Sequence, residues 1–452
     1  MALDLDKFFQ ASNPAKTLDV SKTEDQKYYI DLSSVRGGKV IEELKRTIAR
    51  LSPELPTSQL FTGHVGCGKS TELLRLKMEL EKEGFHVIFF ESSRNLDMGD
   101  IDVTDILLEI ARYVSAEMEK MTIKLQPQGF KALLQGVADV LKNIDVAAEA
   151  NLPGMELSAS TEGEFSLSVG IGKITAKTKD APNLRSQLRQ YLEPRTNMIL
   201  AAINQELLDP ANQQLKQLGK KGLVVIIDNL DRVHSSLSPT GRPQPEYLFI
   251  DRGEQLNKLK CHVVYTLPLG LIFSNELGQL INRFSVEPKV LPMVPVQFRD
   301  GETCEPGLSL LRQAVLARAF PDLTDTERLG LVTEVFDNLT TLDRMCRASG
   351  GHLRQLMVLL RSCLEKQDPP LTKETLERVI TQRRHQQTRA IDQEEWDLLR
   401  QVAKNHSVTG ENGYQTLLRS MFVFEYRYQD MFQDDVWFDI NPILKEAKEF
   451  NT

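Results

Sequence analysis

Residues 63–71 combine three glycines, a lysine and two hydroxyl side chains at a spacing that suits phosphate chemistry. The loop fits the pattern G-x-x-x-x-G-K-[ST] and consists of Gly63, His64, Val65, Gly66, Cys67, Gly68, Lys69, Ser70 and Thr71. The glycines let the backbone curl so that successive N–H groups point at phosphate oxygens. The Lys69 ammonium can reach the β- and γ-phosphates, and the Ser70 hydroxyl can bind Mg²⁺. The loop residues are therefore candidate contacts of a nucleoside triphosphate.

Two aspartates follow an apolar run further along the chain. Residues 223–227 are apolar and rich in β-branched side chains, which is typical of a central parallel strand buried on both faces. Such a strand delivers Asp228 to its carboxyl end, where a carboxylate can complete the Mg²⁺ shell opposite Ser70. Asp231 is a candidate for the group that orients or deprotonates the attacking water. It can equally cap a helix or pair with Arg232, and the sequence leaves both interpretations open.

The elements around these residues predict the strand, loop and helix that the motif requires. An apolar stretch leads into the loop, and residues 71–80 have helical periodicity, so the loop opens a helix whose N-terminus favours anions. Residues 261–266 read as a further strand, which would bring Thr266 beside the γ-phosphate if the two strands are neighbours. Residues 28–38 precede the first strand and contain Arg36. This turn either closes over the base or simply connects two elements.

A later motif, Ser-Gly-Gly-His-Leu-Arg at residues 349–354, completes a recognisable set. Together with the loop, the strand that ends at Asp228 and the strand that ends at Thr266, it resembles the AAA+ class. Within that class the resemblance is to the origin-recognition-like and STAND-type signalling ATPases of bacteria. It covers roughly residues 28–119 and 195–450.

The resemblance implies ATP and Mg²⁺ as ligands and gives roles to further residues. Thr266 would be sensor 1, and Arg354 would be sensor 2, a guanidinium near the γ-phosphate. Arg283 would be an arginine finger that acts on the nucleotide of a neighbour in a homo-oligomer. The residue after the metal-binding aspartate is usually acidic in this family, but here it is Asn229. This departure predicts slow hydrolysis, which suits a switch better than a motor, unless Asp231 supplies the missing carboxylate.

The expected fold is α/β: a three-layer P-loop NTPase with a parallel sheet between helices on both faces, then an α-helical lid, then a winged-helix-like domain. The expected boundaries are 1–298 for the NTPase core, 299–389 for the lid and 390–452 for the winged-helix-like domain. Within the core, about residues 121–195 read as an inserted helix and β-hairpin. The hairpin is predicted because residues 155–160 and 164–172 alternate between apolar and polar side chains.

The composition excludes some classes of protein and disfavours others. The chain has 452 residues, of which 41% are hydrophobic and 26% charged, and no apolar run reaches the length of a membrane span. Its five cysteines are scattered without metal-binding spacing, which predicts a cytoplasmic protein. The net charge is −8, and residues 391–452 carry twelve acidic and six basic side chains. Because phosphate binding needs cations, DNA is disfavoured as a partner of this segment.

These observations favour an ATP-driven molecular switch that couples its nucleotide state to self-association and to a partner protein. The resemblance suggests a setting in bacterial defence or stress signalling. An alternative is a DNA-binding initiator or loader ATPase, which the winged-helix likeness favours and the charge disfavours. A small-molecule kinase would share the loop, but the sequence contains no recognisable second substrate site.

Overall fold

A five-stranded parallel sheet forms the centre of the protein. The computed structural model describes residues 3–451 except 124, 126, 148–166, 180, 239, 411 and 430–433. The strand order is β2-β3-β4-β1-β5, and each neighbouring pair is parallel. The strands are β1 (Ser58–Gly63), β2 (His86–Glu91), β3 (Leu223–Asp228), β4 (His262–Thr266) and β5 (Lys289–Leu291). Strands β1, β3 and β4 are buried along their whole length, as their apolar sequences predict.

The register of the sheet brings the carboxyl ends of the strands to one edge. Glu91 pairs with Asp228, and Phe61 pairs with Thr266. The phosphate loop leaves β1 at the same edge, since β1 ends at Gly63. Ligands of open α/β sheets bind at this edge. The predicted α/β core with a parallel sheet is confirmed.

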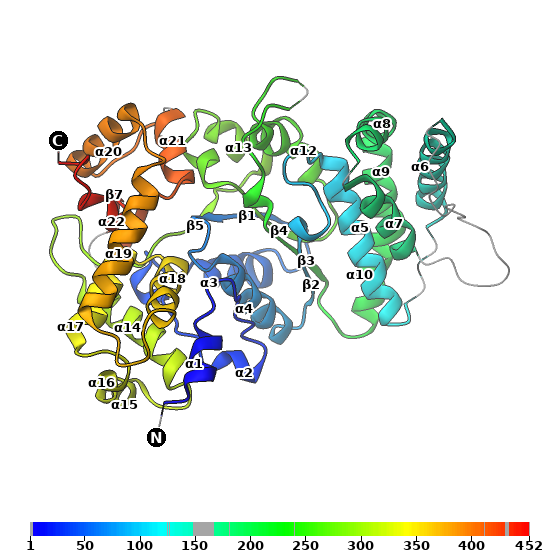
Figure 1. Cartoon of the computed structure of the whole chain (residues 1–452). Coiled ribbons are helices and arrows are strands. Elements are labelled where there is room, and N and C mark those ends of the chain that lie inside the picture. The colour runs from blue at the N-terminus through cyan, green and yellow to red at the C-terminus, as the bar shows by residue number, and fades with distance from the viewer. Residues whose placement is uncertain are drawn as a thin grey trace.

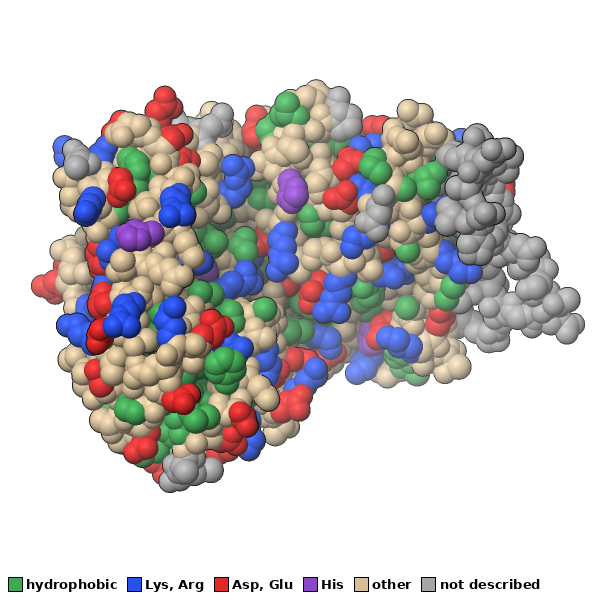
Figure 2. Space-filling view, in the orientation of Figure 1, with side chains coloured by type: hydrophobic (Ala, Val, Ile, Leu, Met, Phe, Trp, Pro, Cys, Tyr) green, Lys and Arg blue, Asp and Glu red, His purple; other side chains and the backbone are tan. Residues whose placement is uncertain are grey.

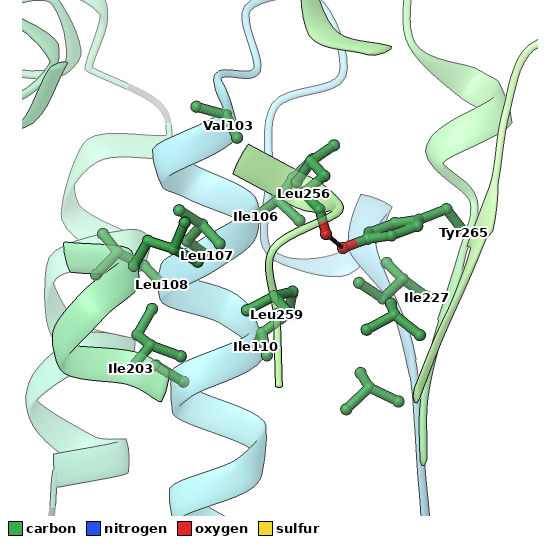
Figure 3. Close-up of a cluster of buried hydrophobic side chains, with 14 of the residues drawn as sticks. Val103, Ile106, Leu107, Leu108, Ile110, Ile203, Ile227, Leu256, Leu259 and Tyr265 are labelled. Atoms are coloured by element: carbon green, nitrogen blue, oxygen red, sulfur yellow. Dashed lines mark hydrogen bonds between the residues drawn. The ribbon is translucent and has the colours of Figure 1, made fainter. Parts of the chain in front are cut away.

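Helices cover both faces of the sheet (Figure 1). On one face lie α3 (Val40–Arg46) and α4 (Lys69–Lys82). The other face packs against α5 (Val103–Lys120) and a set of shorter helices. Figure 3 shows this second core, in which Leu256 and Leu259 lie between the apolar side chains of α5 and Ile227 of β3 and Tyr265 of β4. The Tyr265 hydroxyl donates to the Leu256 carbonyl at 2.9 Å, so the phenol buries no unpaired donor.

The insertion after α5 is helical in the part that the structure describes. Its helices are α6 (Gln128–Ala147), α7 (Leu167–Lys179) and α8 (Pro182–Leu192). Two more helices, α9 (Thr196–Ala202) and α10 (Asp209–Gln217), follow it before β3. The predicted β-hairpin is wrong over 167–172, where α7 forms, and residues 155–160 lie outside the described residues. The buried residues of α7 include Leu167, Ile171, Ile174 and Thr178, which are three or four positions apart. Neighbouring α5 and α8 cover that helical face, and this packing overrides the alternating pattern.

The remaining helices beyond β3 are short until the chain reaches the lid. Those between β3 and β5 are α11 (Gln244–Glu246), α12 (Gly253–Leu256) and α13 (Leu277–Phe284). The helical lid consists of α14 (Glu305–Ala319), α15 (Asp325–Gly330), α16 (Val332–Val335), α17 (Leu339–Ser349), α18 (Leu353–Leu364) and α19 (Lys373–Thr388). The N-terminal helices α1 (Leu5–Ala11) and α2 (Thr23–Gln26) precede the sheet in sequence. However, Phe8, Leu32 and Val35 belong to the lid's hydrophobic core. The first residues therefore pack with the lid, in contrast to the expected single core over 1–298.

The C-terminal region contains two helices followed by a two-stranded antiparallel hairpin. Its elements are α20 (Gln393–Asn405), α21 (Asn412–Arg419), β6 (Val423–Gln429), β7 (Asp434–Ile440) and α22 (Pro442–Lys445). The winged-helix-like domain expected over 390–452 stays a prediction, although helices precede a hairpin here. The hairpin is shared between two cores: Phe438 packs in a core of the C-terminal region, whereas Phe424, Tyr426 and Trp437 join the core on the α4 side of the sheet. The hairpin is thus attached to the NTPase core through its own side chains.

Candidate functional site

The phosphate loop has the conformation that its glycines make possible. Gly66 and Gly68 have φ angles of 90° and 107°, in the left-handed region that side chains disfavour. A Cβ atom at Gly66 would also lie within 3.0 Å of His352 and Arg354 of the lid. Helix α4 starts at Lys69, directly after the loop. Loop N–H groups and a helix N-terminus therefore face the same space, which is an anion-binding arrangement.

Lys69 is buried, with two contacts in this loop and one with Asp231, which follows β3. Its Nζ donates to the carbonyls of Gly63 at 2.7 Å and His64 at 2.8 Å. It also forms an ion pair with Asp231 Oδ2 at 2.9 Å, and both side chains are about 5% exposed. Burial is the largest influence and would lower the pKa of Lys69, but Asp231, together with Cys67 and Asp228, outweighs it and the pKa is raised. Asp231 therefore pairs with the loop lysine and not with Arg232.

Asp228 is the other carboxylate of the site. Its Oδ1 accepts from the Asn229 N–H at 2.7 Å, while its buried Oδ2 has no hydrogen-bond partner among the described residues. Burial, and then the negative charge of Asp231, raises the pKa of Asp228, and the nearby Ser70 hydroxyl opposes the rise. An unpaired carboxylate oxygen beside a hydroxyl fits a Mg²⁺ ion that takes its remaining ligands from phosphate and water. Within the described residues, no cluster of three or more His, Cys, Asp or Glu side chains forms an all-protein metal site.

Thr266 lies behind the site and does not line the cavity. Its hydroxyl donates to the Ile227 carbonyl at 3.2 Å and accepts from the Leu230 N–H at 2.9 Å. The expectation that this hydroxyl senses the γ-phosphate stays a prediction, since in this structure the hydroxyl bonds within the fold. Thr266 instead fixes η6 (Leu230–Arg232), the turn that carries Asp231. Neighbouring strands do bring Thr266 close to the site, but the turn occupies its polar group.

Two arginines face the cavity without a partner. Arg354 follows the N-cap of α18, and its backbone N–H donates to the Gly66 carbonyl at 3.2 Å, so the lid rests on the loop. Arg232 lines the same cavity from η6. In the part of the chain that the structure describes, neither guanidinium has an ion-pair partner within 4.0 Å. Burial, and then repulsion from Arg232, lowers the pKa of Arg354. The sequence pointed to Arg354 but not to Arg232 as a phosphate contact.

The remaining predicted residues divide between the cavity and its support. Val65, Gly66, Gly68, Lys69, Ser70 and Thr71 line the cavity, whereas Gly63, His64 and Cys67 do not. Arg36 also lines it, and its Nη2 donates to the Cys67 carbonyl at 2.8 Å, which braces the loop from one side. Arg283 is 43% exposed, lies 3.9 Å from Glu254, and does not reach this cavity.

A wall of the cavity comes from residues that sequence reasoning missed. Residues 11–18 and 28–32 line it, together with Ala314 of α14 and Met357 of α18. Arg318 closes this end, donating to the Tyr28 carbonyl at 2.6 Å. No local motif marks these segments, because they meet only when the N-terminal chain packs against the lid.

Three comparisons relate this arrangement to known proteins. Residues 38–238 match the model of the KAP family P-loop domain, a span that includes the loop, Asp228 and Asp231. Among solved structures, the Walker-type ATPase PABY2304 of Pyrococcus abyssi is similar over 94% of this chain and 100% of its own, with 11% identity and a TM-score of 0.39. No curated protein matches the chain. The family match is to the KAP domain, so the AAA+ and STAND resemblance stays a prediction. The loop geometry and the family match together identify a P-loop NTPase domain in this chain.

Proposed function

We propose that this protein binds ATP with Mg²⁺ in the cavity between the phosphate loop, the lid and the N-terminal segment, and hydrolyses it slowly. The observation that carries the proposal is the charge arrangement of the cavity. Lys69, Arg354 and Arg232 line one space, and of these three only Lys69 pairs with a carboxylate among the described residues. A polyphosphate would neutralise the mutual repulsion of the two arginines, which makes an anion the natural ligand.

The parts of the nucleotide have separate binding regions in this proposal. The phosphates lie along the loop and the N-terminus of α4, with Lys69 and Arg354 at the terminal phosphate. Mg²⁺ is held by the Ser70 hydroxyl and Asp228 Oδ2. The base lies against the wall made by residues 11–18 and 28–32, where apolar side chains such as Met357 offer a stacking and packing surface.

Slow turnover follows from the chemistry around Asp228. Asn229 stands where a carboxylate is expected, and its amide donates to the Ser93 hydroxyl at 3.1 Å, so it offers no base. Asp231 is the carboxylate that lines the cavity next to Asp228, and its pairing with Lys69 must be broken before it can orient water. A nucleotide that stays bound for a long time suits a switch. In this role the ATP-bound form would self-associate, with Arg283 reaching a neighbour, and would signal to a protein effector.

A nucleotide titration with a matched variant tests the site. Fluorescent ATP with Mg²⁺ should bind the wild type and should lose its affinity for Lys69→Ala. Lys77→Ala is the control, because Lys77 lies on the same helix and pairs with Glu81 away from the cavity. Equal affinities of Lys69→Ala and Lys77→Ala would refute the site. Release of phosphate, followed in the same samples, measures hydrolysis.

The order of elements in the C-terminal region supports a second candidate, a DNA-binding initiator. Two helices followed by a hairpin are typical of a winged helix, but residues 391–452 have a net charge of −6. On the face drawn in Figure 2, acidic and basic side chains are mixed and form no broad basic surface. We therefore assign the region to protein contacts. Salt-sensitive, micromolar binding of duplex DNA by the full chain would favour the initiator instead.

A further inference from the structure

Strand β6 of the C-terminal hairpin meets the phosphate loop at a cluster of rings. The Phe424 ring lies against His64 of the loop, with ring centres 5.7 Å apart and planes at 80°. The same ring stacks on His352, the N-cap of α18, with centres 5.8 Å apart and planes at 22°. Phe424 is fully buried, and both histidines are at most 3% exposed. One phenyl ring thus contacts both the loop and the start of the lid helix.

Hydrogen bonds fix the orientation of both histidines. The Glu425 N–H donates to His64 Nε2 at 3.0 Å, so this nitrogen carries no proton. The Gln355 N–H donates to His352 Nδ1 at 2.8 Å, which leaves His352 Nε2–H to donate to the Val65 carbonyl at 2.8 Å. Burial lowers the pKa of His64 to about 3 and that of His352 to about 4. Both rings are therefore neutral near pH 7, and each has one hydrogen-bonding arrangement.

The hairpin is attached to the surrounding segments at further points. The Tyr426 hydroxyl donates to the Gly350 carbonyl at 2.8 Å, just before the lid helix. The Met293 N–H donates to the Glu425 carbonyl at 3.0 Å, which joins β6 to the chain after β5. A Cβ atom at Gly350 would lie 2.8 Å from the Phe424 ring, so a glycine is needed for this approach. The hairpin is held on both sides of Phe424.

The backbone atoms at the ends of these contacts belong to the phosphate loop, in which Val65 and Gly66 line the nucleotide cavity and His64 lies next to them. His64 presents its carbonyl to Lys69, and the Val65 carbonyl is held by His352. The next loop carbonyl, that of Gly66, accepts from the N–H of Arg354. Moving Phe424 would therefore release the loop and the first turn of α18 together. Since Lys69 and Arg354 lie on these two elements, their relative position depends on the ring.

We propose that Phe424 is a positioning residue for nucleotide binding and that it links the C-terminal hairpin to the state of the phosphate loop. This inference rests on the proposed nucleotide site. It also implies that a partner bound to the hairpin changes nucleotide affinity, and that nucleotide changes the affinity of the partner by the same factor. Removing residues 391–452 would therefore weaken nucleotide binding, whereas an independent C-terminal domain could be removed without effect.

The test compares two phenylalanines of the same hairpin. Phe438 lies on β7 opposite Glu425 and packs on Phe273, with ring centres 5.3 Å apart, in the core of the C-terminal region. Phe424→Leu should weaken binding of fluorescent ATP about tenfold, while Phe438→Leu should change it less than about twofold. Thermal unfolding of both variants confirms that each is folded at the assay temperature.

A spectroscopic measurement on otherwise intact protein supports the comparison. Trp437 stacks on Tyr426 in the hairpin, with ring centres 5.5 Å apart, and Trp396 is the other tryptophan. In a Trp396→Phe background, ATP should shift the emission of Trp437, and Phe424→Leu should reduce that shift. Equal ATP affinities of the two leucine variants, with unchanged Trp437 emission, would overturn the inference. If the wild type binds no nucleotide, the proposed function fails first, and the outcomes are distinguishable.

Discussion

Replacing Asp231 by asparagine should tighten ATP binding and slow hydrolysis at the same time. The carboxylate of Asp231 lies 2.9 Å from Lys69 Nζ, in a pair that is almost fully buried. A triphosphate needs the same ammonium, so the carboxylate competes with it. Once ATP is bound, Asp231 also repels the phosphates. Asparagine keeps the size and an acceptor oxygen but removes the charge, and both effects favour binding.

The magnitude follows from the distance between the charges. At an effective dielectric constant of about 20, two unit charges 2.9 Å apart interact by roughly 6 kcal/mol, an upper limit because desolvation opposes it. If ATP binding costs the wild type about a quarter of this interaction energy, Asp231→Asn removes that cost and binds ATP about tenfold more tightly. The gain should be smaller for ADP, which carries less charge near Lys69. Turnover should fall about 10²-fold if Asp231 acts on the attacking water.

Calorimetric titration with ATP and ADP measures the affinities, and phosphate release measures turnover. Asp397→Asn is the matched control, because Asp397 is exposed on α20 and pairs only with Arg400 among the described residues. Affinity for ATP that is unchanged or weaker in Asp231→Asn would refute the competition. A loss of turnover below about threefold would refute a role of Asp231 in the chemical step.

Other substitutions separate metal binding, turn geometry and pH dependence. Asp228→Ala should abolish Mg²⁺-dependent phosphate release but keep binding of ATP in EDTA; turnover at the wild-type rate would exclude Asp228 as the metal residue. Thr266→Val should lower the free energy of unfolding by about 1–3 kcal/mol, because the buried Leu230 N–H loses its acceptor, whereas Thr266→Ser should not. Burial, and then the charge of Asp102, raises the pKa of Asp105 to about 7. Because this pKa is raised on folding, ionisation of Asp105 lowers the free energy of unfolding as pH rises from about 4 to about 7. In urea unfolding, Asp105→Asn should reduce this pH-dependent loss of stability by a few kcal/mol. An identical pH profile in the variant would contradict the assignment.

The parts of the site that the sequence predicted are those encoded by short segments. The loop, the helix after it and the strand that ends at Asp228 each depend on fewer than about twenty neighbouring residues and on backbone chemistry with few alternatives. Arg354 was predicted from the resemblance, on the short motif at residues 349–354. These features were predictable because local sequence and tertiary structure agree.

The parts that were missed depend on contacts between distant residues. Glu425 and His64 are 361 positions apart, and nothing in either segment signals that they meet. Thr266 shows the same limit, because its strand was predicted but the turn that takes its hydroxyl was not. Helix α7 shows a different limit of sequence prediction. Its segment alternates between apolar and polar side chains, but a helix forms because flanking helices cover one of its faces. In each case tertiary packing determined the local structure, and such packing cannot be predicted from a short stretch of sequence.

The division of the site among segments bears on what the family match can explain. Residues 38–238 contain the loop, Asp228 and Asp231, to which we assign phosphate and Mg²⁺ binding. They do not contain Arg354, Phe424 or the cavity wall near the N-terminus. The shared P-loop domain therefore accounts for binding of a triphosphate in general. Under the proposed function, the flanking segments would decide which base is accepted and how tightly the terminal phosphate is held, because their residues line the rest of the cavity.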